Sequence, residues 1–129
     1  MGPADLRCLT LHPIWADAIA RGPKRIENRS WRPPEGTTWI AIHAGAKDPL
    51  ESVGLAKSLG WSGEGRATSA VVALVRIGEI VERSDDPWFM GPLGWTLVEV
   101  RRIEPIPAVG RLGLWRPDAD TMQAITKHL

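Results

Sequence analysis

Alternating hydrophobic and polar positions predict the strands of this 129-residue chain. Successive side chains of a strand point to opposite faces, so a strand with one buried face alternates apolar and polar residues. Residues 6–11 follow this pattern weakly, and the β-favouring residues of 38–44 and 94–103 predict two further strands. Residues 69–82 form the longest apolar run and are rich in Val and Ile, which predicts a central strand that bends near Gly78.

Apolar residues at helical spacing predict three short helices. Residues 13–21 begin with proline and are followed by glycine, as helix ends favour. Residues 49–59 form the second predicted helix. Residues 118–128 form the third, and the side chain of Asp118 is its candidate cap.

The remaining segments are predicted as turns, a loop and a short strand. Residues 104–107 contain two prolines and are expected to turn away from the strand before them, and residues 110–115 supply a last extended piece. The loop at residues 84–92 carries two aromatic residues that we expect to be exposed, Trp88 and Phe89. They either form a lid or stacking surface, or pack the loop onto the rest of the domain.

These elements do not alternate as regular strand–helix–strand units. The expected fold class is therefore mixed α+β: a small, closed or half-closed β-barrel of five to six mostly antiparallel strands with about three short helices. The length suits one domain, spanning residues 1–129.

Composition limits the classes of function. Sixteen basic and fifteen acidic side chains give a formal charge of +1, so any site for nucleic acid must be a local basic patch. The single cysteine, Cys8, is expected in the core of a protein from a reducing compartment. No stretch approaches the roughly 18 apolar residues that cross a bilayer. We expect a soluble, cytoplasmic protein that does not enter membranes.

Residues 24–31 concentrate the candidate chemistry of the chain. Ile26 is the one plain core residue in this segment, and Lys24 projects from the turn before it. If the segment is extended, one face carries Arg25, Glu27, Arg29 and Trp31. This face is either a solvated surface with ion pairs of small energetic value or the wall of a binding or catalytic site. Trp31 beside Arg32 favours the second interpretation, because indole and guanidinium groups suit bases and phosphates.

Two further residues are candidates for the same site. Trp15 lies beside the apolar stripe of the first helix, where it either completes the core or edges a cleft. His43 ends a strand and is either a structural histidine or a cleft residue. Gly45 follows it and would let a ligand approach the backbone.

The sequence resembles the activating-signal-cointegrator homology (ASCH) domain family. The resemblance rests on residues 9–16, on residues 22–31 with their Gly-x-Lys-x-x-Glu-x-Arg-x-Trp pattern, and on residues 40–44. Residues 77–80, 91–95 and 105–107 add to it, so that it covers about four fifths of the chain.

The resemblance implies a PUA-like β-barrel with a cleft that binds RNA or another single-stranded nucleic acid. Lys24 and Arg29 would neutralise phosphate, Trp15 or Trp31 would stack on a base, and Glu27 would accept a hydrogen bond from a base or a ribose hydroxyl. We expect a monomer or weak dimer. The nucleic-acid-binding residues expected from the resemblance and from the segment itself are Trp15, Lys24, Glu27, Arg29, Trp31, Arg32 and His43.

The alternative is a small, metal-independent hydrolase of RNA or of modified nucleosides. Some bacterial relatives remove acyl groups from modified cytidine with a threonine nucleophile, and this chain has Glu27 at the matching position. A carboxylate is a poor substitute for that hydroxyl, which argues against the same mechanism. Lys24 and Glu27 would instead act as an acid–base pair.

Neither a metal nor a cofactor is expected. His12, His43 and His128 are far apart in the sequence, and Cys8 has no partner cysteine.

Overall fold

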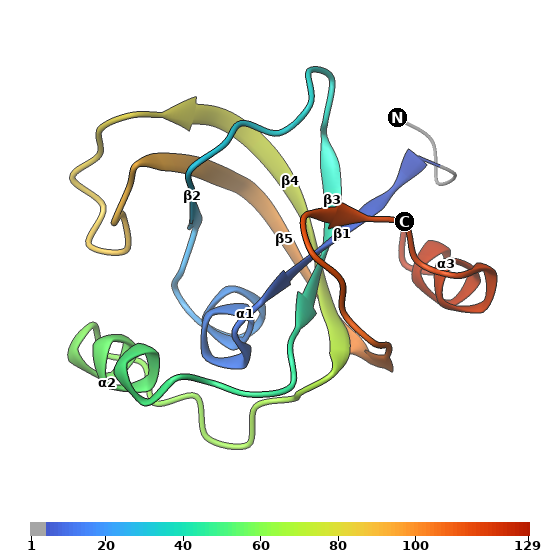
Figure 1. The fold of residues 1–129 in the computed structure, drawn as a ribbon, viewed down its shortest axis with the longest axis horizontal. Helices are drawn as coiled ribbons and strands as arrows, with labels where there is room; N and C mark the ends of the chain where they lie inside the picture. The colour runs from blue at the N-terminus through green and yellow to red at the C-terminus, as the bar shows by residue number, and fades with distance from the viewer. Residues whose placement is uncertain (1–4) are drawn as a thin grey trace.

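The computed structural model describes residues 5–129, which fold around one curled sheet (Figure 1). Within these residues the sheet has six strands, in the order β2-β5-β4-β3-β1-β6. Strands β1 and β3 are parallel, and every other neighbouring pair is antiparallel. The strands are β1 (Arg7–Leu11), β2 (Ile26–Arg29), β3 (Trp39–Ala44), β4 (Ala70–Val81), β5 (Leu93–Pro107) and β6 (Leu114–Trp115).

Three helices in the described part of the chain accompany the sheet: α1 (Pro13–Ala20), α2 (Leu50–Ser58) and α3 (Ala119–Thr126). Pro13 opens α1, where a missing backbone N–H removes no helical hydrogen bond. The carboxylate of Asp118 caps α3 by accepting a hydrogen bond from the N–H of Thr121, as predicted. None of the described helices is long and apolar enough to cross a membrane.

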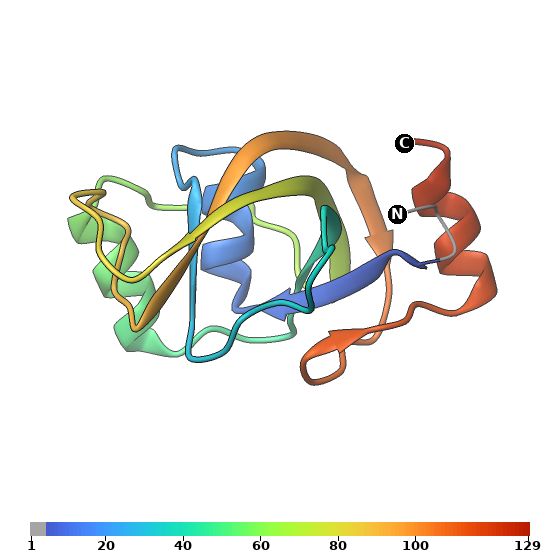
Figure 2. The same cartoon turned by 90° about the horizontal axis from the view of Figure 1, so that it is seen from above.

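The long strands β4 and β5 give the sheet its curl. They arch over the rest of the domain, as Figure 2 shows from above. The pairing register of β4 and β5 shifts between Ile77 and Ile80, at the predicted bend near Gly78. Since β2 and β6 remain unpaired with each other at the two ends of the sheet, the sheet is a half-barrel. The predicted mixed α+β barrel-like fold is therefore confirmed.

The central strands β1 and β3 and the first half of β4 are buried on both faces of the sheet. Alternate residues of β1 and β3, such as Leu9 and Ile42, pack with Ile19 of α1 in one core cluster. The residues between them, such as Cys8, pack on the opposite face with Ile125 of α3. Helix α1 thus occupies the concave side of the half-barrel (Figure 1), where it supports the ends of β1 and β3.

Two expectations about loops are wrong. Residues 104–107 do not turn away, because β5 continues through Pro107 and pairs with Ala70 of β4. Strand β2 pairs only with residues 93–96, so this end of β5 has an open edge, where proline is tolerated. Trp88 is not exposed: its side chain is 5% accessible and packs beside Ala18 and Ile26.

Candidate functional site

A groove of about 750 Å³ opens on the concave side, between the two ends of the sheet. It is lined by the last residues of β1 and β3, the start of α1, strand β2 and the loop at residues 108–113. The side chains that bring polar, charged or aromatic chemistry to it are Thr10, His12, Trp15, Glu27, Asn28, Arg29, His43, Lys47 and Arg111.

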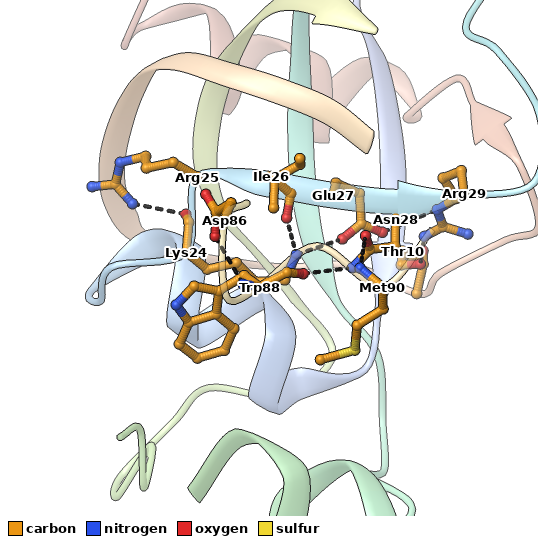
Figure 3. Close-up of polar contacts among 10 residues, drawn as sticks. All are labelled: Thr10, Lys24, Arg25, Ile26, Glu27, Asn28, Arg29, Asp86, Trp88 and Met90. Atoms are coloured by element: carbon orange, nitrogen blue, oxygen red, sulfur yellow. Dashed lines mark hydrogen bonds and ion pairs between the residues drawn. The ribbon is translucent and has the colours of Figure 1, made fainter. Parts of the chain in front are cut away.

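Three charged side chains of residues 24–29 form one cluster beside this groove (Figure 3), and two of them, Glu27 and Arg29, line it. Glu27 Oε1 accepts a hydrogen bond from Lys24 Nζ at 3.2 Å, and Glu27 Oε2 accepts one from Arg29 Nε at 3.0 Å. Lys24 Nζ also donates to the carbonyl oxygen of Ile26. The carboxylate of Glu27 is thereby held between two cations, and the cluster has one net positive charge.

Lys24 and Arg29 differ in their exposure to solvent. Lys24 is 2% exposed and Glu27 is 6% exposed, so each needs the other to compensate for lost hydration. The side chain of Arg29 is 23% exposed and lines the groove. The positive charge that a ligand would meet is therefore the guanidinium of Arg29.

Arg29 also bridges the open side of the half-barrel. Its Nη2 donates a hydrogen bond to the backbone carbonyl oxygen of Thr10 at 3.2 Å, which connects β2 to β1. These two strands are not neighbours in the sheet. Since Glu27 fixes the other side of the guanidinium, the orientation of Arg29 is set before any ligand arrives.

Trp15 stands where the groove meets a smaller recess of about 160 Å³. The recess is walled by Trp15, Lys24, Glu27 and Trp88, among others. The indoles of Trp15 and Trp88 meet edge to face, with ring centroids 6.1 Å apart.

Asn28 holds the loop that carries Trp88. Its Nδ2 donates to the carbonyl oxygen of Trp88 at 3.0 Å, and its Oδ1 accepts from the N–H of Met90 at 2.8 Å (Figure 3). The loop is therefore packed onto β2, which was the second of the two interpretations of its aromatic residues.

His43 is buried at the floor of the groove and is 1% exposed. Its Nε2 lies 2.7 Å from the carbonyl oxygen of Ala108, which can only accept, so Nε2 carries the proton. Its Nδ1 then accepts from the hydroxyl of Thr10 at 3.1 Å, and that hydroxyl oxygen accepts from Nε1 of Trp115 at 2.9 Å. Burial lowers the pKa of His43, which favours this neutral ring.

The hydrogen bond to Ala108 makes His43 the support of the loop at residues 108–113. A Cβ atom on Gly110 would lie 2.8 Å from Cε1 of His43 and 2.7 Å from Oγ1 of Thr10, so the loop contacts the ring directly. Both ring nitrogens of His43 make hydrogen bonds within the protein. The ring therefore holds the loop that lines the groove and has no free nitrogen to act as a base toward a ligand.

The structure adds two basic residues that the sequence patterns did not indicate, Lys47 and Arg111. Both are exposed and line the groove. The segment of Lys47 is fixed by its neighbour Asp48, which accepts from the N–H of Ile14 at 2.9 Å and from Arg66 Nε at 2.8 Å. An arginine in the glycine-flanked segment 110–113 is the signal in the sequence that could have indicated Arg111.

The expected site residues are only partly brought together. Trp15, Glu27, Arg29 and His43 line the groove, and Lys24 lines the adjoining recess. The other two lie elsewhere: the Trp31 ring packs 5.0 Å from that of Trp95, and Arg32 pairs with Glu82 at 3.2 Å. A role of Trp31 and Arg32 in binding stays a prediction.

Arg25 also departs from the expected face of residues 24–31. Its guanidinium points away from Glu27 (Figure 3) and donates to the carbonyl oxygens of Gly22 and Lys24, each at 2.9 Å. Arg25 therefore closes the turn after α1 and does not join the wall of the groove. As for metal ligands, residues 5–129 contain no group of three His, Cys, Asp or Glu side chains placed to hold an ion.

The fold and the site define a class: a curled half-barrel with a basic, tryptophan-edged groove on its open side. The model of the ASCH domain family matches residues 9–107, which is more than half of the chain. The chain therefore belongs to the ASCH domain family.

Comparison with individual proteins agrees with this assignment. The chain is 47% identical over 45 residues to activating signal cointegrator 1 of Homo sapiens and 44% identical over 45 residues to that of Mus musculus. Each match covers 34% of this chain but only 8% of the relative, so the chain spans a small part of these longer proteins.

Solved structures share the fold. The crystal structure of ASCH from Zymomonas mobilis has a TM-score of 0.63 with 16% sequence identity, over 98% of this chain and 96% of that one. A single-substitution variant of the Zymomonas protein gives a TM-score of 0.61 with 17% identity, over 95% and 96% of the two chains. At these identities the likeness concerns the fold alone.

Proposed function

We propose that this ASCH domain binds single-stranded RNA in the groove between Trp15, Arg29, Lys47 and Arg111. The observation that carries the proposal is the fixed guanidinium of Arg29, held by Glu27 at 3.0 Å and by the carbonyl of Thr10 at 3.2 Å at the edge of the groove. Preorganised arginine suits phosphate, because its planar fork loses little freedom on binding.

The surroundings of Arg29 suit the other parts of a nucleotide. Trp15 offers an indole edge or face to a base at the mouth of the recess. Lys47 and Arg111 place two more positive charges on the rim, where successive phosphates of a strand would pass. The groove is open rather than enclosed, which suits a continuous strand.

A direct titration tests the proposal. Fluorescence anisotropy of a labelled, randomised eight-nucleotide RNA should show that the native chain binds it. Lys47→Gln should lower the affinity about fivefold, because an exposed charge contact contributes ~1 kcal/mol to binding. Arg83→Gln is the matched control, because Arg83 is exposed and lies outside the groove.

Two outcomes would contradict the proposal. The first is that the native chain fails to bind this RNA. The second is that Lys47→Gln and Arg83→Gln reduce affinity equally, which would mean that the groove has no part in binding. Lys47 is exposed and can be changed without disturbing the core.

A further inference from the structure

A second hollow adjoins the groove on the far side of the loop at residues 108–113. Its volume is about 810 Å³, similar to that of the groove. The two hollows share three residues, Ser69, Val109 and Arg111, which form the divide between them. They are therefore contiguous along the surface and are separated only by the side chains of this divide.

The divide is firmly attached to the sheet. The N–H of Ala108 donates to the carbonyl oxygen of Ser69 at 3.0 Å, and the N–H of Ser69 donates to that of Gly45 at 2.9 Å. His43 holds Ala108 from below at 2.7 Å. Ser69 itself has a positive φ of 51°, an uncommon backbone conformation for a residue with a side chain. The backbone of this path is thus held at Ser69 and Ala108.

The side chains along this path suit a strand with charged and apolar parts. Arg111 stands in both hollows, and Arg116 adds a second guanidinium to the second hollow. At the tip of the loop, Val109 is 85% exposed and Leu112 is 99% exposed. These two side chains offer apolar contacts beside the guanidinium of Arg111.

The acidic residue of the second hollow limits what can sit there. Asp118 accepts a hydrogen bond from the N–H of Thr121 at 2.8 Å through Oδ1, and this bond lowers its pKa. The carboxylate is therefore charged at neutral pH and would repel a phosphate beside it. A base or ribose donor facing Asp118, with the phosphate toward Arg116, is the arrangement that satisfies both charges.

We propose that the RNA strand continues from the groove over Val109 and Arg111 into the second hollow, where Arg116 contacts a phosphate. This inference rests on the proposed function and extends it to the length of the strand that the domain recognises. OB-fold domains, which are small barrels of another class, bind roughly 4–16 nucleotides. The first hollow accommodates the first nucleotides, and the second becomes occupied only by longer strands.

A comparison of two strand lengths tests this inference. Anisotropy titrations would use labelled, randomised RNAs of two and eight nucleotides with the native chain, Arg116→Gln, Arg111→Gln and the control Arg83→Gln. Arg116→Gln should lower affinity for the eight-nucleotide RNA about fivefold and leave the two-nucleotide RNA unchanged. Arg111→Gln should weaken both, because Arg111 lines both hollows.

The outcomes separate the two proposals. One outcome would overturn the proposal that RNA binds in the second hollow and would leave the groove as the binding site. It is that Arg116→Gln and Arg83→Gln bind the eight-nucleotide RNA equally, while Arg111→Gln binds it more weakly. An equal loss for both RNA lengths in Arg116→Gln would also overturn it, since length dependence is its signature. If the native chain binds neither RNA, the proposed function itself fails.

Discussion

At the scale of single residues, the site depends on Glu27. A buried carboxylate is costly unless it is paired, and Glu27 is paired twice, with Lys24 and with Arg29. Both carboxylate oxygens accept hydrogen bonds from cations, so Glu27 affects a ligand through the position of Arg29. In the proposed function it is a positioning residue.

This arrangement makes a prediction about Glu27→Gln. An amide has one acceptor oxygen in place of two, so it cannot hold both Lys24 and Arg29. RNA affinity should fall about fivefold, and no turnover of RNA or of an acylated nucleoside should appear in metal-free buffer, with either the native chain or the variant. Binding is measured by anisotropy and turnover by chromatography.

Lys24→Met is the companion variant, because it keeps the stem and removes the charge. It leaves the buried Glu27 with Arg29 alone and should lower the free energy of unfolding by about 3 kcal/mol in urea denaturation. Native turnover that drops by roughly 10²–10⁴ fold in Glu27→Gln, with substrate affinity retained, would contradict the binding role and support the hydrolase.

At the scale of elements, strand β3 and the loop at residues 108–113 are joined through His43. The ring connects Thr10 of β1 to Ala108 at the start of the loop, and it meets Trp115 of β6 edge to face with centroids 5.4 Å apart. Burial disfavours a positive charge on this ring. The neutral ring is therefore part of the folded structure.

The lowered pKa of His43 predicts how stability depends on pH. The ordinary pKa of histidine is 6.5 and the pKa of His43 in the folded protein lies below it, so between these two values the unfolded chain binds more protons. This contribution to stability is complete above pH 6.5 and is lost as the pH falls toward the folded pKa. For one proton the slope cannot exceed about 1.4 kcal/mol per pH unit.

Urea denaturation at several pH values from 7 to 5 checks this prediction. The free energy of unfolding should decrease on acidification in the native chain, and His43→Gln should show a shallower decrease in the same range. The difference in pH dependence between the native chain and His43→Gln gives the contribution of His43 separately from that of the other histidines. Parallel curves for the two chains would show that His43 does not titrate on unfolding.

At the scale of the whole molecule, the charges nearly cancel. With a formal charge of +1, the long-range field offers little attraction for nucleic acid. The positive potential is local, from Arg29, Lys47 and Arg111 around the groove and Arg116 in the second hollow. This distribution is made by the half-barrel, which brings together segments far apart in the chain.

The local character of the charge predicts the salt dependence of RNA binding. For single-stranded RNA, the slope of log K against log salt is about −0.7 for each phosphate neutralised. Removing the groove contact in Arg29→Ala should make the slope shallower by roughly 0.7, whereas Arg83→Ala should leave it unchanged. Circular dichroism would verify that Arg29→Ala remains folded, because this residue also bridges β2 and β1. A slope unaffected by Arg29→Ala would place the phosphate contacts elsewhere.

Local patterns determined several features of the protein. The alternation around Ile40 and Ile42 predicts β3, and the cap at Asp118 predicts the start of α3. Each of these depends on residues within a turn or a strand of one another, so the physical information is present in the local sequence.

Other features were decided by contacts between residues distant in the sequence. Trp31 lies outside the groove because its ring packs against Trp95. The loop at residues 108–113 lines the groove because His43, 65 residues before Ala108, holds it there. The sequence by itself determined that Glu27 and Arg29 share one face of a strand, and this face becomes a wall of the groove. Only the tertiary structure decided what lies opposite that wall, because the curl of the sheet selects the segments that meet across its open side.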